Sequence, residues 1–238
     1  MRFFLDGLAE AWRIVIGGEP WLWQLVTVTL KVSLISTGAA IVLGLPLALL
    51  LGLGRFRGRG ALMVVANAGL GLPPVLVGLV FALLMFPEAP LGRFHLLFTL
   101  NGVIIAQTAL AFPVIVALGA AALREVPAGL LDQARAFHAS RFRVAALAVR
   151  EARTGLLAAI IAAVGSGLSE VGAVVLVGGN IEGLDQTLAS AALQRVEAAR
   201  FADGLAIGIV LLGLILIITA LLTIVQAGRG MRRVGWSS

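Results

Sequence analysis

One acidic side chain interrupts a long apolar stretch near residue 170. Glu170 is the only carboxylate in the interior of an apolar run. A carboxylate facing lipid costs about 2.5 kcal/mol or more, so we expect Glu170 to face other helices or a cavity. Two roles are consistent with this placement: a group at a gate or subunit interface, or a structural acid that is hydrogen-bonded between helices. Direct anion binding is disfavoured because like charges repel.

Small and neutral polar residues surround this acid. Ser166, Ser169 and Asn180 supply neutral hydrogen-bond donors, and glycines stand at 172, 178 and 179. Gly172, Gly178 and Gly179 allow an exposed backbone, and amide N–H groups at a broken helix end would hold an oxyanion transiently. The same glycines would equally serve the close packing of helices. Both interpretations stay open at this stage.

The remaining reactive side chains exclude several enzyme classes. Lys31 is the only lysine and follows Leu30, so the chain has no phosphate-binding loop of the Walker A type. Without cysteine there is no disulfide, thiolate metal site or cysteine nucleophile. His95 and His138 stand alone, which predicts no metal site, and no histidine lies in an apolar run to activate Ser166 as a protease. We therefore predict no catalytic residue. Lys31 would either raise the positive potential at the outer mouth or snorkel to the outer headgroups.

The segments that carry these residues have the composition of membrane helices. Hydrophobic residues make up 60% of the 238 positions and charged residues 13%. A bilayer core needs about 20 apolar residues in a helix, and continuous rather than alternating runs favour helices over barrel strands. Five runs meet this requirement: Trp21–Leu53, Ala61–Phe86, Leu96–Leu123, Thr154–Ile181 and Gly204–Ala227.

The arginines predict the direction of these spans. With the N-terminus outside, the inner segments hold 12 of the 18 basic residues and three acids, whereas the outer segments hold five arginines and eight acids. The inner arginines are Arg55, Arg57, Arg59, Arg124, Arg135, Arg141, Arg143, Arg150, Arg153, Arg229, Arg232 and Arg233. Cytoplasmic loops of membrane proteins are enriched in such residues. We therefore expect a multi-pass inner-membrane protein with its N-terminus outside and its C-terminus in the cytoplasm, and the net charge of +6 needs no nucleic-acid partner.

Two local patterns refine the helices. Residues 1–20 place apolar side chains at helical spacing among charged ones, from Phe4 to Val15, which predicts a peripheral amphipathic helix; a loosely ordered tail is the alternative. Within the spans, Gly71-Leu72-Pro73-Pro74 and Phe112-Pro113 should break or kink their helices.

A charged segment at 124–153 separates the third and fourth spans and is too long for a simple turn. Val126-Pro127 ends the third span, and Ala128–His138 predicts a short helix with Leu130, Leu131, Ala134 and Phe137 on one side. Such a helix would dock into a groove of another protein or pack on its own bundle.

The stretch Leu131–Arg141 resembles the "EAA" loop of type I ABC importer permeases. In register, Asp132 replaces the glutamate of that pattern, Gln133 and Ala134 the alanines, and His138 the glycine, while Ala148, Arg150 and Glu151 depart from its Ile-x-Leu-Pro end. The resemblance covers the chain from about Trp21 to Gly228. It implies that the loop couples to an ATPase subunit through Asp132, Gln133, Ala134, Arg135, Phe137, His138, Ala139, Ser140 and Arg141.

A second stretch, Leu168–Ile181, is similar to the fourth core span of oxyanion permeases. Ser169-Glu170-Val171-Gly172-Ala173, followed by Val177-Gly178-Gly179-Asn180-Ile181, is most similar to tungstate permeases, as is Arg-Glu-Ala-Arg at 150–153. This resemblance implies a homodimer, a pair of cytoplasmic ATPase subunits that hold ATP and Mg²⁺, and an extracytoplasmic binding protein that delivers the oxyanion. This chain itself needs no cofactor.

These observations together predict an all-α membrane protein of the type I ABC importer permease fold. Residues 1–20 form the peripheral helix, 21–228 the permease domain with its coupling loop, and 229–238 a cytoplasmic tail. The predicted cargo is tungstate first and molybdate second. The translocation path or gate would contain Glu170, Ser166, Ser169, Gly172, Gly178, Gly179, Asn180 and Lys31. The alternative function is a stand-alone secondary transporter or channel for a small solute.

Overall fold

The computed structural model describes the backbone of residues 2–230 and the side chains of residues 7–227. In this part of the chain every regular element is a helix, which confirms the predicted all-α class. In chain order the elements are α1 (Arg2–Gly17), α2 (Pro20–Leu53), α3 (Arg59–Gly69), α4 (Pro74–Met85), the 3₁₀ turn η1 (Gly92–Phe94), α5 (Leu100–Arg124), α6 (Ala128–Ala136), α7 (Arg141–Glu151), α8 (Arg153–Leu168), α9 (Gly172–Gly178), α10 (Leu188–Glu197) and α11 (Phe201–Gly230).

Three unbroken helices, α2, α5 and α11, are long and apolar enough to cross a membrane. α2 and α5 pack closely because small residues stand at their contact. A Cβ atom added to Gly52 would lie 2.7 Å from Leu123 Cβ, and one added to Gly44 would lie 3.1 Å from Ile115 Cγ2. Glycine at these two positions therefore permits the close approach of the two backbones.

The second and fourth predicted spans are broken helices rather than continuous ones. α3 and α4 meet at an angle of 100°, and α8 and α9 at 57°. The first break was predicted from Pro73-Pro74, and it lies there, because Pro74 begins α4. Pro113, in contrast, does not break its helix: α5 is continuous through it from Leu100 to Arg124. Counting each bent pair as one span gives up to five crossings.

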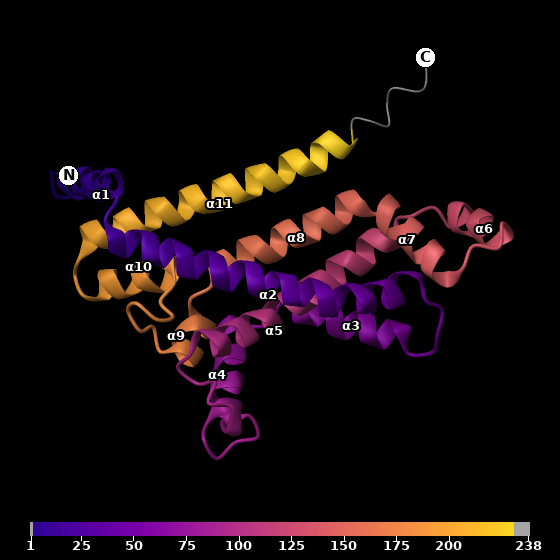
Figure 1. Cartoon of the computed structure of the whole chain (residues 1–238), viewed down its shortest axis with the longest axis horizontal. Helices are drawn as coiled ribbons and strands as arrows, with labels where there is room; N and C mark the ends of the chain where they lie inside the picture. Colours follow the sequence, from indigo (N-terminus) through magenta and orange to yellow (C-terminus); the bar gives the residue numbers. More distant parts are fainter. Residues whose placement is uncertain (1, 231–238) are drawn as a thin grey trace.

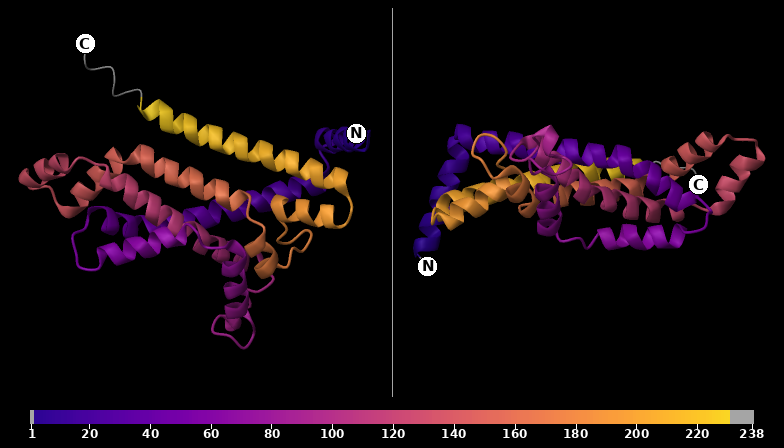
Figure 2. Two further views of the ribbon diagram at one scale, coloured as in Figure 1. Left: turned by 180° about the vertical axis from the view of Figure 1, so that it is seen from behind. Right: turned by 90° about the horizontal axis from the view of Figure 1, so that it is seen from below.

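Figure 1 shows α2, α5, α8 and α11 running along the long axis, whereas α4 projects to one side. α1 lies at one end of the bundle, and α6 and α7 lie at the other. Figure 2, viewed from behind and from below, shows the same separation of the two ends. We call the second end the arginine end, because the predicted inner arginines of α3, α5, α6, α7 and α8 belong to helix ends and loops there.

The peripheral helix predicted near the N-terminus is α1. It packs against α11, with Ala11 fully buried and Ile14 against the cluster around Leu22 and Ile207. Leu8, Trp12 and Ile16 are exposed one turn apart on the other side, as is typical of an interfacial helix. The short helix α10 was not predicted, and it begins with a capping box between Thr187 and Ser190.

Candidate functional site

A group of mostly polar residues lies where α2, α5 and α8 meet, and all but Ser166 and Gly167 are buried. We call this group the polar junction. It comprises Ser33, Ser36 and Thr37 of α2, Gln107 of α5, Ser166 and Gly167 of α8, and Glu170 directly after α8. Of these, only Ser166 and Glu170 were among the predicted site residues. Polar groups are costly in such surroundings unless they are hydrogen-bonded, so their clustering is informative.

Gln107 joins the helices of the polar junction. Its Nε2 donates to the carbonyl of Gly167 at 3.3 Å, and a Cβ atom added to Gly167 would lie 3.4 Å from Gln107 Oε1 and 3.5 Å from Ser33 Oγ. Gln107 Oε1, Ser33 Oγ and Thr37 Oγ1 are buried without a hydrogen-bond partner among the described residues. A cavity of about 10 Å³ lies beside Gln107, Ser36, Ser166 and Glu170. This volume suits one water molecule, which would satisfy Gln107 Oε1.

Glu170 lies in the break between α8 and α9 and is only 9% exposed. Its Oε1 accepts a hydrogen bond from the backbone N–H of Ala173 at 3.0 Å. The carboxylate therefore satisfies an amide at the start of α9, where a helix leaves N–H groups unpaired. The hydrogen bond is to the backbone of its own segment, not to a side chain of another helix.

Ser166 and Ser169 lie on the exposed side of α8, together with Ala162. The hydroxyl of Ser169 donates to the carbonyls of Gly165 and Ser166, at 3.1 and 3.2 Å. This side of α8 carries small, uncharged side chains, and the buried Glu170 follows Ser169 in the chain. The structure thus brings Ser166, Ser169 and Glu170 together.

The other predicted path residues have different surroundings. Cβ atoms added to Gly172 and Gly178 would lie 2.6 Å from Val75 Cγ2 and 2.7 Å from Val103 Cγ2, so both glycines stand at helix contacts. Gly179 ends α9 with φ +87°. Asn180 Nδ2 donates to the Ser190 carbonyl at 3.5 Å.

Lys31 is exposed on α2, on the side of that helix opposite its buried residues. The role of these residues in a path stays a prediction.

The predicted coupling segment forms two helices, α6 and α7, joined by a tight turn. Leu131 is buried in the cluster around Leu51 and Val144, and Ala134 packs against it, whereas Phe137 is 87% exposed. The prediction that Phe137 shares a side with Leu131 is therefore wrong. α6 ends at Ala136, so Phe137 no longer follows the helical repeat.

The turn itself agrees with the register of the EAA pattern. His138, which replaces the pattern's glycine, has φ +56°, in the left-handed region that glycine occupies most easily. Its neighbours complete the turn: Ala139 N–H donates to the Ala134 carbonyl at 3.0 Å, and Ser140 Oγ accepts from Arg143 N–H at 3.4 Å to cap α7. Asp132 and Arg135 form an exposed ion pair at 2.6 Å. Gln133 and Arg141 are exposed, and Phe142 is 90% exposed.

A second buried acid lies at the end of the bundle opposite the arginine end, in the loop after α9. Asp185 is fully buried, and its Oδ1 accepts from Ile181 N–H at 2.7 Å, while Oδ2 has no partner among the described residues. Burial raises the pKa of Asp185 above its ordinary value of 3.8, and the hydrogen bond from Ile181 opposes this effect. Asp185 is one of the eight acids of the predicted outer segments, and nothing in the sequence indicates that it is buried.

Residues 44–230 match the family described as "binding-protein-dependent transport system inner membrane component". The chain is 39% identical over 206 residues to a probable anion ABC transporter permease protein of Haloferax volcanii, covering 84% of this chain and 89% of the relative. It is 27% identical to the tungstate uptake system permease protein of Peptoclostridium acidaminophilum, over 95% of this chain and 99% of the relative. The molybdenum transport system permease protein of Azotobacter vinelandii is 28% identical over 75% of this chain and 82% of its own.

Among solved structures, inward-facing conformations of the MetNI methionine ABC transporter share the fold, with a TM-score of 0.66. The identity is 22%, and the alignment covers 91% of this chain and 99% of that chain. This likeness and the named relatives confirm the resemblance drawn from Leu131–Arg141 and Leu168–Ile181. The chain belongs to the family of binding-protein-dependent transport system inner membrane components and has the fold of the type I ABC importer permeases.

Proposed function

We propose that this chain is the permease subunit of an ATP-driven importer for a tetrahedral oxyanion, with tungstate the first candidate cargo and molybdate the second. The observation that carries the proposal is the extent of the match to named permeases. The relatives named for tungstate align over 95% and 89% of this chain, and those named for molybdenum over at most 75%. The family implies a binding protein that delivers the anion. Because this chain has no Walker A motif, ATP would be bound by a separate ATPase subunit.

The exposed side of α8 is the surface that we assign to the path. Ser166 and Ser169 offer neutral groups there, and no described arginine lies on α8 beyond its first residue. A permease has to release its anion, and a few hydroxyl groups bind a dianion more weakly than a cluster of arginines would. Glu170 contributes by fixing the start of α9 and not by binding the anion, because its charge has the same sign.

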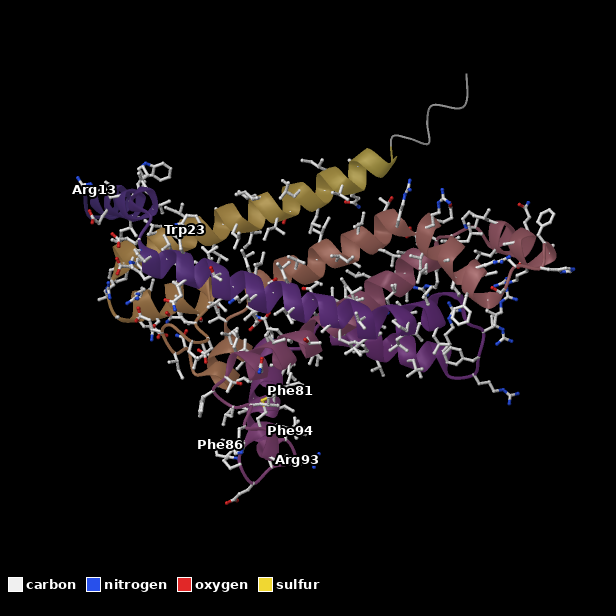
Figure 3. All side chains as sticks on the ribbon, viewed as in Figure 1. Arg13, Trp23, Phe81, Phe86, Arg93 and Phe94 are labelled. Atoms are coloured by element: carbon white, nitrogen blue, oxygen red, sulfur yellow. The ribbon has the colours of Figure 1, made fainter. Side chains whose placement is uncertain are left out.

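A second copy of the chain would close this path, and α4 is the element that we expect to contact it. α4 projects from the bundle in Figure 3, with Phe81 on it, Phe86 directly after its end, and Arg93 and Phe94 in the η1 turn beside that end. Phe86 and Phe94 are 55% and 54% exposed, and Arg93 lies 4.7 Å from the Phe94 ring centroid. The exposed apolar side chains of this projecting arm form the surface that we assign to the contact with the second copy.

The turn between α6 and α7 is the surface that we assign to the ATPase. Phe137 and Phe142 are the most exposed large apolar side chains among the described residues, while Leu131 holds α6 on the bundle. Exposed aromatic side chains on a rigid support are typical anchors of a protein interface. The arginines at this end support a cytoplasmic position for it, on the side where the partner would bind ATP and Mg²⁺.

The test is competitive uptake into proteoliposomes that contain the permease, its ATPase and its binding protein. We expect ATP-dependent tungstate uptake that survives a modest excess of molybdate. Uptake abolished by that excess would leave an oxyanion importer and remove the tungstate assignment. Uptake without ATP or ATPase would instead favour a secondary carrier or channel.

A further inference from the structure

A pocket of about 290 Å³ opens at the arginine end, between the last turns of α2 and α5 and the start of α6. We call it the arginine pocket. Its charged lining consists of Arg55, Arg59, Arg124, Arg135 and Asp132, and Leu131 forms part of its apolar wall. Its volume is near the lower limit of small-ligand sites, which is about 300 Å³.

Two of these arginines already have partners within the chain. Arg59 donates to the carbonyls of Leu51 and Gly52, at 2.7 and 3.2 Å, and so satisfies the C-terminal end of α2. Arg135 pairs with Asp132, which neutralises the only acid of the lining. These contacts explain why two arginines stand here without any ligand.

Arg55 and Arg124 have no such explanation. Both side chains are exposed, and neither makes a hydrogen bond or an ion pair with the side chains described for residues 7–227. Helix capping therefore accounts for Arg59 but not for them. Arg55 and Arg124 therefore line the pocket with positive charge that no acid of the lining offsets, because Asp132 is already paired with Arg135.

We propose that the arginine pocket binds one phosphate-type anion, held by Arg55 and Arg124. A guanidinium group binds the oxygens of a phosphate through two parallel N–H donors, and two such groups match one tetrahedral anion. The pocket lies where the spans end, so the anion could be the headgroup of an acidic phospholipid or a free phosphate. The site is separate from the exposed side of α8, and it does not depend on which oxyanion is transported.

Thermal unfolding of the full-length permease in detergent, followed by tryptophan fluorescence, tests this proposal. The probes are inorganic phosphate and dioctanoyl phosphatidylglycerol, with dioctanoyl glycerol as the control without phosphate. The variants are Arg55→Gln and Arg124→Gln. Arg57→Gln is the matched control, because Arg57 is an exposed arginine of the same loop that does not line the pocket.

We expect an anionic probe to raise Tm for the parent and for Arg57→Gln, and its apparent Kd to increase about tenfold or more in either pocket variant. A response to phosphatidylglycerol alone identifies a lipid headgroup, whereas an equal response to inorganic phosphate identifies a free anion. Equal responses of Arg55→Gln and Arg57→Gln, or none in the parent, overturn the proposal. A third result would also overturn the proposal: no probe binds the parent, and the pocket variants no longer co-purify with the ATPase. The arginines would then bind an acidic residue of the ATPase rather than a phosphate-type anion.

Discussion

At the scale of single residues, the described contacts separate the roles of the two buried acids. Glu170 faces a cavity beside Gln107 and satisfies the amide of Ala173. Asp185 satisfies the amide of Ile181 with one oxygen and leaves the other unpaired. A carboxylate oxygen that is buried without a partner, as in Asp185, is costly when the group is charged.

We predict that Glu170→Gln keeps the stability of the permease, because the amide oxygen of glutamine can still accept from Ala173 N–H. Glu170→Leu removes the acceptor and should lower the free energy of unfolding by about 1 kcal/mol. Thermal unfolding in detergent measures this difference in stability. The rate of oxyanion uptake tests whether Glu170 has a role in gating. If Glu170→Gln is as stable as the parent but transports slowly, the charge has a role beyond the hydrogen bond. Parental stability and uptake in Glu170→Leu would contradict both roles.

For Asp185 we predict a dependence of stability on pH. Because burial raises its pKa in the folded state, the folded state binds the proton more tightly than the unfolded chain does. Its contribution to stability is therefore complete below 3.8 and is lost as the pH rises through the raised pKa. In Asp185→Asn, the oxygen still accepts from Ile181 and no charge forms. The Tm of this variant should fall less than that of the parent between acid and neutral pH, and equal slopes would contradict the prediction.

The sequence identified Glu170 but not the polar junction around it. An acid in an apolar run is conspicuous because its cost in lipid is large. Gln107, Ser33 and Thr37 are neutral and tolerated in many helices, so nothing in the sequence indicates that they meet. Their convergence depends on how α2, α5 and α8 cross, which is a property of the tertiary structure.

At the scale of elements, the contact between α4 and α9 shows why the chain is broken twice. Both short helices follow a break, and they pack through glycine: a Cβ atom added to Gly78 would lie 2.6 Å from the Cα of Ala173. The first break was predictable because Pro73-Pro74 cannot continue a helix. The second has no proline, and its position at residues 169–171 was not predicted. Pro113 lies inside α5, where neighbouring helices support the backbone.

We predict that Gly78→Ala lowers the free energy of unfolding by about 1–3 kcal/mol, because the methyl group forces the backbones of α4 and α9 apart. Gly213→Ala is the control: it makes the same change within α11, where a Cβ atom would have nothing within 4 Å. This control should be neutral or stabilising, since alanine favours helix. Melting curves of Gly78→Ala and Gly213→Ala, each compared with the parent, test this prediction. Equal curves for the two variants would mean that the α4–α9 contact is not close.

For the α6–α7 turn we predict that Phe137→Asp folds normally, because the side chain is 87% exposed, but loses docking to the ATPase. ATP hydrolysis in the reconstituted complex should then become uncoupled from uptake. Phe137→Leu, which keeps an apolar anchor, is the control and should retain most uptake. Normal assembly and transport by Phe137→Asp would place the docking surface elsewhere.

At the scale of the whole molecule, the arginines that were predicted to share one side of the membrane gather at one end of the bundle. The arginine end carries α6 and α7, and α1 lies at the opposite end of the bundle (Figure 1). The composition predicted the membrane, and the arginines predicted which loops share a side, because both depend on long-range solvent forces rather than on local packing.

The orientation itself is testable because the chain contains no cysteine, so a single introduced thiol is the only site for a maleimide. Arg57 is exposed at the arginine end, and Glu197 is exposed near the end of α10. We expect a membrane-impermeant maleimide to label Glu197→Cys in intact cells and Arg57→Cys only after the membrane is permeabilised. Permeabilised cells thus provide the accessibility control for both variants. The reverse pattern would place the arginine end outside, where no cytoplasmic ATPase could reach Phe137, and would contradict both the topology and the coupling surface.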